Sequence, residues 1–161
     1  MDNFLYVGEF HEKFGLDNCT YHRPGPRNLP PDAIEFRKKF MREELDEFSQ
    51  ACADGDQAKA FDALLDLVYV AMGTAHLMGF PWHQGFNEVQ RANMTKERAT
   101  HAGDPRSVRG HALDVVKPLN FIPPDLVNIL KNHGWFKTCA ADPLCPGAPE
   151  QNTLFCAAHR R

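Results

Sequence analysis

Hydrophobic residues recur every three or four positions over most of the first 133 residues, which is the spacing of amphipathic helices. Asp32 and Asp56 are placed to cap two long helices, Gly79 is placed to end the second of them, and Gly15 is placed to end the helix before them. No segment alternates with the two-residue period of a strand. The pattern predicts an all-α fold built on two long antiparallel helices joined by a tight turn. The predicted helices cover residues 3–15, 32–53, 57–78, 81–93 and 126–133.

Composition narrows the class of protein and its partners. The 161 residues are 43% hydrophobic and 24% charged, with a net charge of -3, so neither nucleic acid nor a membrane surface is an expected partner. The longest apolar stretch, residues 64–80, contains Asp66 and is shorter than the roughly 20 residues of a membrane span. Five cysteines and no basic leader favour a cytoplasmic protein. We expect one domain at residues 1–135 and an irregular tail at 136–161.

Acidic residues stand out on the first long helix because they interrupt its apolar side. Stepping by about 100° per residue places Glu44 and Glu47 inside the apolar arc and Glu43 at its edge. Arg37 is the one basic residue on that face, since the other basic residues of this helix lie opposite. The helical projection therefore predicts that Glu44 and Glu47 point inward.

The second long helix repeats this arrangement. It is apolar nearly all round, which predicts burial on most sides, yet Asp62 and Asp66 share one stripe of it with Gly73. Unpaired carboxylates are costly to bury, and divalent cations would relieve their mutual repulsion. All-oxygen ligands suit Mg²⁺ or Mn²⁺, and we expect Glu44, Glu47, Asp62 and Asp66 to bind two or three ions. A solvated acidic face remains the alternative, whereas a di-iron site would need Glu-x-x-His pairs that are not present.

The next helix carries residues suited to phosphate. Asn93 and Lys96 continue the apolar stripe of Val89, so they are expected to face the interior, where Lys96 could contact phosphate. A snorkelling lysine and a satisfied buried amide are the alternatives. With metals present, one acid of the set Glu43, Glu44 and Glu47 could take a proton from an attacking water. No glycine-rich phosphate loop is present, which favours cleavage of a nucleotide's own phosphate chain.

Three motifs in order carry a resemblance to a known family: Glu43 to Glu47, Asp62 to Val70, and Arg91 to Lys96. Over residues 4–133 the chain resembles the MazG-like all-α nucleoside triphosphate pyrophosphohydrolases, in particular a phage-encoded branch related to phosphoribosyl-ATP pyrophosphohydrolase. The resemblance implies hydrolysis of a nucleoside triphosphate to the monophosphate and pyrophosphate with Mg²⁺ or Mn²⁺. It also implies a helical bundle completed by oligomerisation, as a homodimer or homotetramer. Many members have Glu-x-x-Asp in the second motif, where this chain has Ala63 in place of the glutamate.

Substrate choice is the least constrained expectation. Purine-specific relatives in phages convert dGTP or GTP to the monophosphate, and the motifs here are most similar to theirs, which implies (d)GTP metabolism in a host cytoplasm. Phe14 and His11 are the candidates for stacking on the base, and the alternative for Phe14 is an ordinary core position. A pyrophosphohydrolase of another base specificity, a non-catalytic nucleotide-binding or regulatory subunit, and a helical interaction module remain open.

Overall fold

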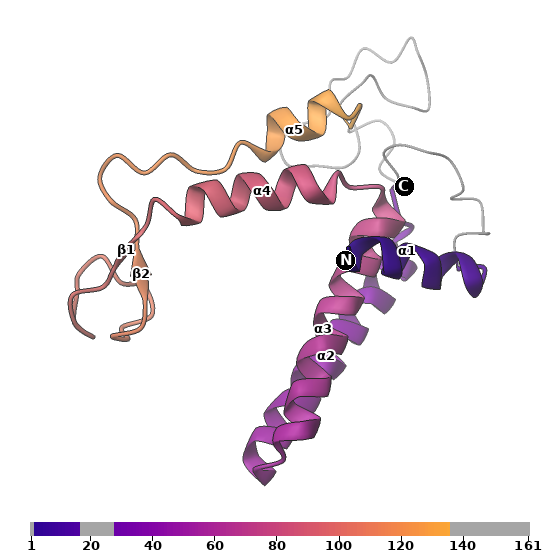
Figure 1. Cartoon of the computed structure of the whole chain (residues 1–161), viewed down its shortest axis with the longest axis horizontal. Coiled ribbons are helices and arrows are strands. Elements are labelled where there is room, and N and C mark those ends of the chain that lie inside the picture. The colour runs from indigo at the N-terminus through magenta and orange to yellow at the C-terminus, as the bar shows by residue number, and fades with distance from the viewer. Residues whose placement is uncertain (1, 17–27, 136–161) are drawn as a thin grey trace. The chain divides into compact units, whose positions relative to one another are not determined.

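The described part of the computed structural model, residues 2–16 and 28–135, is mostly helical, as the sequence predicts (Figure 1). The tail at 136–161 lies outside the described residues, so the expectation of an irregular tail stays a prediction. A two-stranded antiparallel ribbon is the one element that the pattern did not indicate. The elements are α1 (Asn3–Lys13), α2 (Pro31–Asp54), α3 (Gln57–Met78), α4 (Trp82–Asn93), β1 (Glu97–Arg98), β2 (Val115–Val116) and α5 (Leu126–Asn132).

Local sequence explains where most helices begin and end. Asp56 caps α3 as predicted, since its side chain accepts a hydrogen bond from the Lys59 backbone N–H at 3.0 Å. Gly55 and Gly79 end α2 and α3 in the left-handed conformation, with φ of 70° and 66°. The predicted cap at Asp32 is wrong. Pro30 is the N-cap of α2 and makes no side-chain cap bond, because Pro31 already presets the first helical turn.

The chain forms two compact units, and α2 and α3 are the largest part of the first, which comprises the described residues up to 82 together with 133–135. The two helices pack against each other as the predicted antiparallel hairpin (Figure 1), and α1 packs on α3. Small side chains allow the close approach: Ala51, Ala63, Val70 and Gly73 are buried. Two aromatic stacks complete this unit, Phe4 on Trp82 at 5.5 Å and Phe80 on Trp135 at 4.7 Å between ring centroids.

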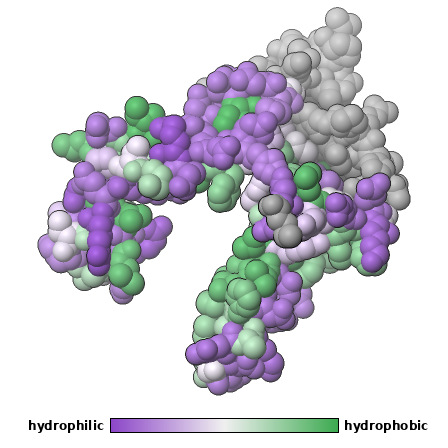
Figure 2. Space-filling model, in the orientation of Figure 1, coloured by the Kyte–Doolittle hydropathy of each residue, from purple (hydrophilic) through white to green (hydrophobic). Residues whose placement is uncertain are grey.

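One side of α3 is apolar and exposed, so the prediction that this helix is buried on most sides is wrong for the single chain. Phe61, Leu64, Leu65 and Val68, here called the α3 stripe, are 43–65% exposed, and apolar surface follows the hairpin in Figure 2. By length and composition alone, α3 could also cross a membrane. Core helices of soluble proteins pass the same test, so this is weak evidence for a membrane span. Among the described residues, nothing covers the α3 stripe.

The second unit, residues 83–132, contains most of α4, the ribbon and α5. Glu88 of α4 holds this unit together: it receives two hydrogen bonds from the Arg91 guanidinium and a third, at 3.0 Å, from the backbone N–H of Asp125. These donors lower the pKa of Glu88 to about 2. The charged form of Glu88 thus fixes the segment that precedes α5.

The loop between β1 and β2 contains the same four-residue turn twice, at residues 101–104 and 111–114, both reading His-Ala-x-Asp. In each turn the third residue's backbone N–H donates to the histidine Nδ1, at 3.0 and 3.1 Å. The aspartate N–H donates to the histidine carbonyl, at 3.1 and 2.9 Å. Both turns bury the aspartate that ends them, Asp104 and Asp114.

Candidate metal and phosphate site

Glu44 is the acidic residue that the hairpin buries. Only 7% of the residue is exposed, and none of the described residues forms a hydrogen bond or ion pair with its carboxylate. Burial raises the pKa of Glu44, and the carboxylates of Asp66, Glu47, Glu43 and Asp62 raise it further. The inward placement of Glu44 is confirmed, and acids of both helices contribute to its raised pKa.

The other predicted metal ligands are not buried. Glu47, Asp62 and Asp66 are exposed, so their expected inward placement is wrong for the described part of the single chain. Glu43, expected at the edge of the apolar arc, is exposed as well. The physical reason is that helical projection identifies a face but not what covers it, and the neighbouring α3 stripe is uncovered as well. By the 100° step, Asp62 and Asp66 lie between the stripe and the side of α3 that contacts α2. The acids border the uncovered surface.

Whether these residues fit a divalent cation is a matter of donor chemistry and charge. They offer only carboxylate oxygens, the ligands that Mg²⁺ and Mn²⁺ prefer, and Glu44 is a buried charge without a compensating cation among the described residues. In residues 2–16 and 28–135, no three acidic, histidine or cysteine side chains are close enough together to form a finished metal site. The set fits the ion in chemistry and charge, but its ligand geometry is not preassembled.

Arg37, a predicted substrate contact, is buried on the same side of α2. Its guanidinium donates to the Thr74 hydroxyl at 3.0 Å and to the Val70 carbonyl at 2.7 Å, and it lies 5.5 Å from the Phe40 ring centroid. Desolvation lowers the pKa of Arg37. These contacts pin α2 to α3, which is a structural role, and a contact with substrate stays a prediction.

Gly73 is a residue whose importance the sequence only hinted at. A Cβ at this position would lie 2.7 Å from His11 Nε2 and 2.9 Å from Arg37 Nη2, so α1, α2 and α3 meet here only because the residue is glycine. His11 is buried at this junction, 2% exposed. Gly73 shares the stripe of Asp62 and Asp66, so the acidic stripe ends at the packing point of three helices.

Phe14, the other candidate for contact with a base, is 58% exposed, and the alternative that it is a core residue is therefore wrong. It follows the last residue of α1 and packs on Phe10, with 4.7 Å between ring centroids. Lys13 Nζ lies 5.3 Å from the Phe14 ring centroid. An exposed ring beside a cation could stack on a base, which stays a prediction.

Asn93 and Lys96 belong to the second unit. Asn93 is the last residue of α4 and is exposed, so its expected inward placement is wrong, because α4 ends there and presents only Ala92 as a buried residue. Lys96 follows in the turn into β1, where its backbone N–H donates to the Asn93 carbonyl at 3.1 Å. The side chain of Lys96 is partly exposed and forms no ion pair with the described residues. Both residues remain candidates for phosphate contact.

A two-helix hairpin with acids on both helices is the architecture of the MazG-like all-helical nucleoside triphosphate pyrophosphohydrolases, and this chain is part of that superfamily. Within it, the model of the phosphoribosyl-ATP pyrophosphohydrolase family matches residues 7–93, more than half of the chain, so the chain belongs to that family. No curated protein matches the chain. The matched residues contain the hairpin and its acids, and the ribbon and α5 lie beyond them. Membership supports a pyrophosphohydrolase-type activity.

Proposed function

We propose that the protein hydrolyses a nucleoside triphosphate to the nucleoside monophosphate and pyrophosphate. The observation that carries the proposal is Glu44, a buried residue whose pKa is raised by burial and by four neighbouring carboxylates, and whose carboxylate no cation of the described residues pairs with. Keeping such a charge destabilises the fold unless a ligand uses it. Family membership adds the type of bond that is cleaved, a phosphoanhydride.

The proposed ligands are Glu44, Glu47, Asp62 and Asp66 for two or three Mg²⁺ or Mn²⁺ ions. Bound ions would neutralise phosphate oxygens and lower the pKa of a water. An acid of the set Glu43, Glu44 and Glu47 accepts the proton of that water as its oxygen bonds to phosphorus. The bond between the α and β phosphates breaks, and its electron pair leaves with pyrophosphate.

The proposed assembly is a homodimer or homotetramer in which a second copy covers the α3 stripe. Four large apolar side chains at i, i+3, i+4 and i+7 form a continuous helical seam, which is the geometry of helix-to-helix packing. Asp62 and Asp66 border that seam, so pairing of two hairpins would enclose the acids. Light scattering tests this: the wild type should exceed the 18.2 kDa of one chain, and Leu64→Glu should reduce its mass. A monomeric wild type would contradict the assembly.

The proposed substrate is dGTP or GTP, in phage nucleotide metabolism within a host cytoplasm. Motif similarity supports this choice, and exposed Phe14 offers a surface on which a purine could stack. A panel of eight ribo- and deoxyribonucleoside triphosphates with Mn²⁺ tests it by chromatography. Faster turnover of the guanine nucleotides supports it, and preference for a pyrimidine contradicts it.

The same panel separates the proposed reaction from the alternatives. Monophosphate plus pyrophosphate supports the pyrophosphohydrolase. Diphosphate plus orthophosphate contradicts the position of cleavage. Binding without turnover favours a non-catalytic nucleotide-binding subunit instead. For an interaction module whose acids contact a basic partner, Glu44→Ala and Asp66→Ala would leave Mn²⁺ affinity unchanged.

A further inference from the structure

The β1–β2 ribbon separates its charged residues by face. Glu97 pairs with Val116 and Arg98 with Val115, and the Ala99 N–H donates to the Asp114 carbonyl at 2.9 Å. Side chains alternate along a strand, so one face, the inner face, holds Glu97, Ala99, Asp114 and Val116. Ala99, Asp114 and Val116 are all buried. The ribbon therefore has one covered side and one open side.

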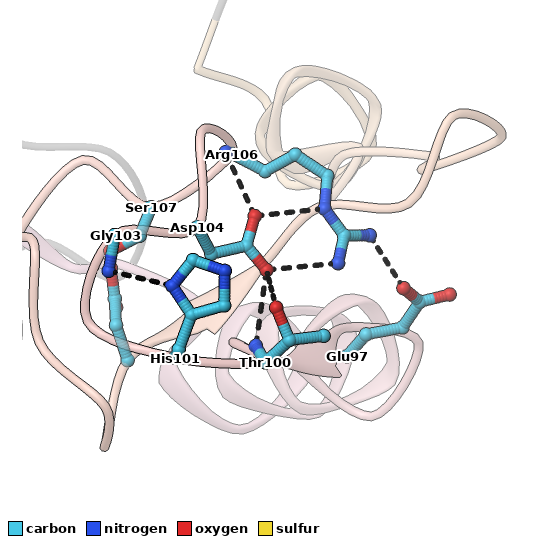
Figure 3. Close-up of polar contacts among 8 residues, drawn as sticks. Glu97, Thr100, His101, Gly103, Asp104, Arg106 and Ser107 are labelled. Carbon is cyan, nitrogen blue, oxygen red and sulfur yellow. Dashed lines mark hydrogen bonds and ion pairs between the residues drawn. The ribbon is translucent and has the colours of Figure 1, made fainter.

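The acids of the inner face are neutralised within the loop. Arg106 bridges Asp104 and Glu97, with N–O distances of 3.1 and 2.8 Å (Figure 3). Arg109 pairs with Asp114 at 2.6 Å, and the Ser107 hydroxyl donates to the same carboxylate at 2.8 Å. Arg106 and Arg109 therefore both form ion pairs with acids of the loop and its ribbon.

The charged residues expected on the open side are all cations, and exposed Val115 lies among them. The pair Arg98–Val115 places Arg98 on this side, and Lys96 and Lys117 directly precede and follow the pair Glu97–Val116, where alternation past the strand ends would place them on the same side. In the described part of the chain, no carboxylate pairs with any of the three, and Lys117 Nζ lies 5.3 Å from the Phe121 ring centroid. Like charges gathered on one side of a ribbon destabilise it. Lys96, Arg98 and Lys117 are here called the cationic face.

The spacing of these cations suits a short, highly charged anion. Directly opposite side chains in a ribbon have Cβ atoms about 5 Å apart, and diagonal neighbours lie about 7–8 Å apart. Three cations within that span match adjacent phosphates of one chain better than a long backbone with single charges. Arg98 adds a planar fork that can bind two phosphate oxygens together.

We propose that the cationic face binds the triphosphate chain of a nucleotide, with Arg98 and Lys117 as binding residues beside Lys96. The proposal rests on the proposed function for the identity of the nucleotide, but not for the binding of phosphate. Arg98 and Lys117 lie beyond residues 7–93, the region that the family model matches.

The test is the binding of inorganic triphosphate, in EDTA, measured by calorimetry on the full chain. Arg98→Gln and Lys117→Gln should each weaken binding about tenfold, the effect of one charge-assisted contact. Lys131→Gln, which removes an exposed lysine from α5 of the same unit, should change binding less than twofold. Circular dichroism and melting curves establish that the variants fold, because these side chains are exposed.

Unchanged binding in folded Arg98→Gln and Lys117→Gln would overturn the proposal, as would an equal loss in Lys131→Gln. Displacement of triphosphate by a single-stranded DNA at lower concentration would assign the face to nucleic acid and also overturn it. The two proposals fail separately. Triphosphate binding without hydrolysis of any nucleotide removes the proposed function alone, and hydrolysis with KM unchanged in both variants removes the cationic face alone.

Discussion

Buried carboxylates occur in both units, and their surroundings differ. Glu44 in the hairpin and Asp104 and Asp114 in the ribbon loop are 7%, 4% and 7% exposed. The Arg106 guanidinium and the backbone and hydroxyl of Thr100 hold the pKa of Asp104 well below its usual range. Ser107 and Arg109 lower the pKa of Asp114 to about 2, whereas the pKa of Glu44 is raised. Burial alone therefore does not distinguish these acids; what sets Glu44 apart as the candidate is that its pKa is raised rather than lowered.

The largest difference between Glu44 and the aspartates of the ribbon loop should appear in catalytic activity. Glu44→Gln should lower kcat by about a thousandfold, because it removes a metal ligand or the proton acceptor. Nucleotide hydrolysis by the purified variants, measured as pyrophosphate release, checks this. Glu35→Gln is the matched control on α2: Glu35 is exposed and pairs only with Lys38, so its activity should stay within twofold. Equal activity in Glu44→Gln and the wild type would contradict a catalytic or metal-binding role for Glu44.

The second difference should appear in metal-linked stability. Mn²⁺ at about 100 times its Kd should stabilise the wild type by about 2.7 kcal/mol, because only the folded state binds it. Differential scanning fluorimetry measures the rise in Tm. Asp66→Asn should lose that rise, and without metal it should melt about 2–4 °C higher, because repulsion on Glu44 is relieved. Asp104→Asn should retain the metal-dependent rise in Tm. Loss of that rise in Asp104→Asn but not in Asp66→Asn would contradict the assignment of the metal site to the hairpin.

The third difference is local order. Asp104→Asn should raise amide exchange at Thr100 and Arg106 about tenfold, since both backbone N–H groups donate to this carboxylate. The hairpin amides should be unaffected. Hydrogen exchange read by mass spectrometry resolves the two regions. Protection lost in α2 rather than in the loop would contradict a purely local role.

The smallest difference is in pH dependence, where the two regions have opposite signs. The raised pKa of Glu44 means that the metal-free hairpin gains stability as the pH falls from 7 through that pKa. The lowered pKa values of Asp104 and Asp114 contribute stability above about pH 3.9, which is lost as the pH falls further, toward about 2 for Asp114. Hydrogen exchange at pH 7, 5 and 3 would show this, and parallel changes in both regions would refute it.

The sequence predicted features that depend on neighbouring residues. The ends of α2 and α3 follow from Gly55, Asp56 and Gly79, which act within one turn. The inward position of Glu44 follows from helical periodicity. The exposure of Asp62 could not be predicted, because it depends on what packs against α3 rather than on α3 itself.

The sequence pattern did not predict the β1–β2 ribbon, for a different reason. Its strands are two residues long, which is too short for an alternating pattern to be recognised. The twin turns at 101–104 and 111–114 are a detectable signal, a four-residue repeat ten positions apart, but its meaning depends on hydrogen bonds to the side chains. The separation of charges on the ribbon needs the register Glu97 to Val116, which is a long-range property.

The α3 stripe has a consequence for how such an enzyme would behave on dilution. Since Asp62 and Asp66 lie at the margin of the surface that the proposed second copy covers, catalytic centres would be completed only when chains meet. The rate of hydrolysis would then rise with the square of the free-chain concentration at low expression, whereas specific activity would rise in proportion to that concentration and level off once pairing saturates. Turnover of the nucleotide pool would therefore grow faster than the amount of protein as the protein accumulates.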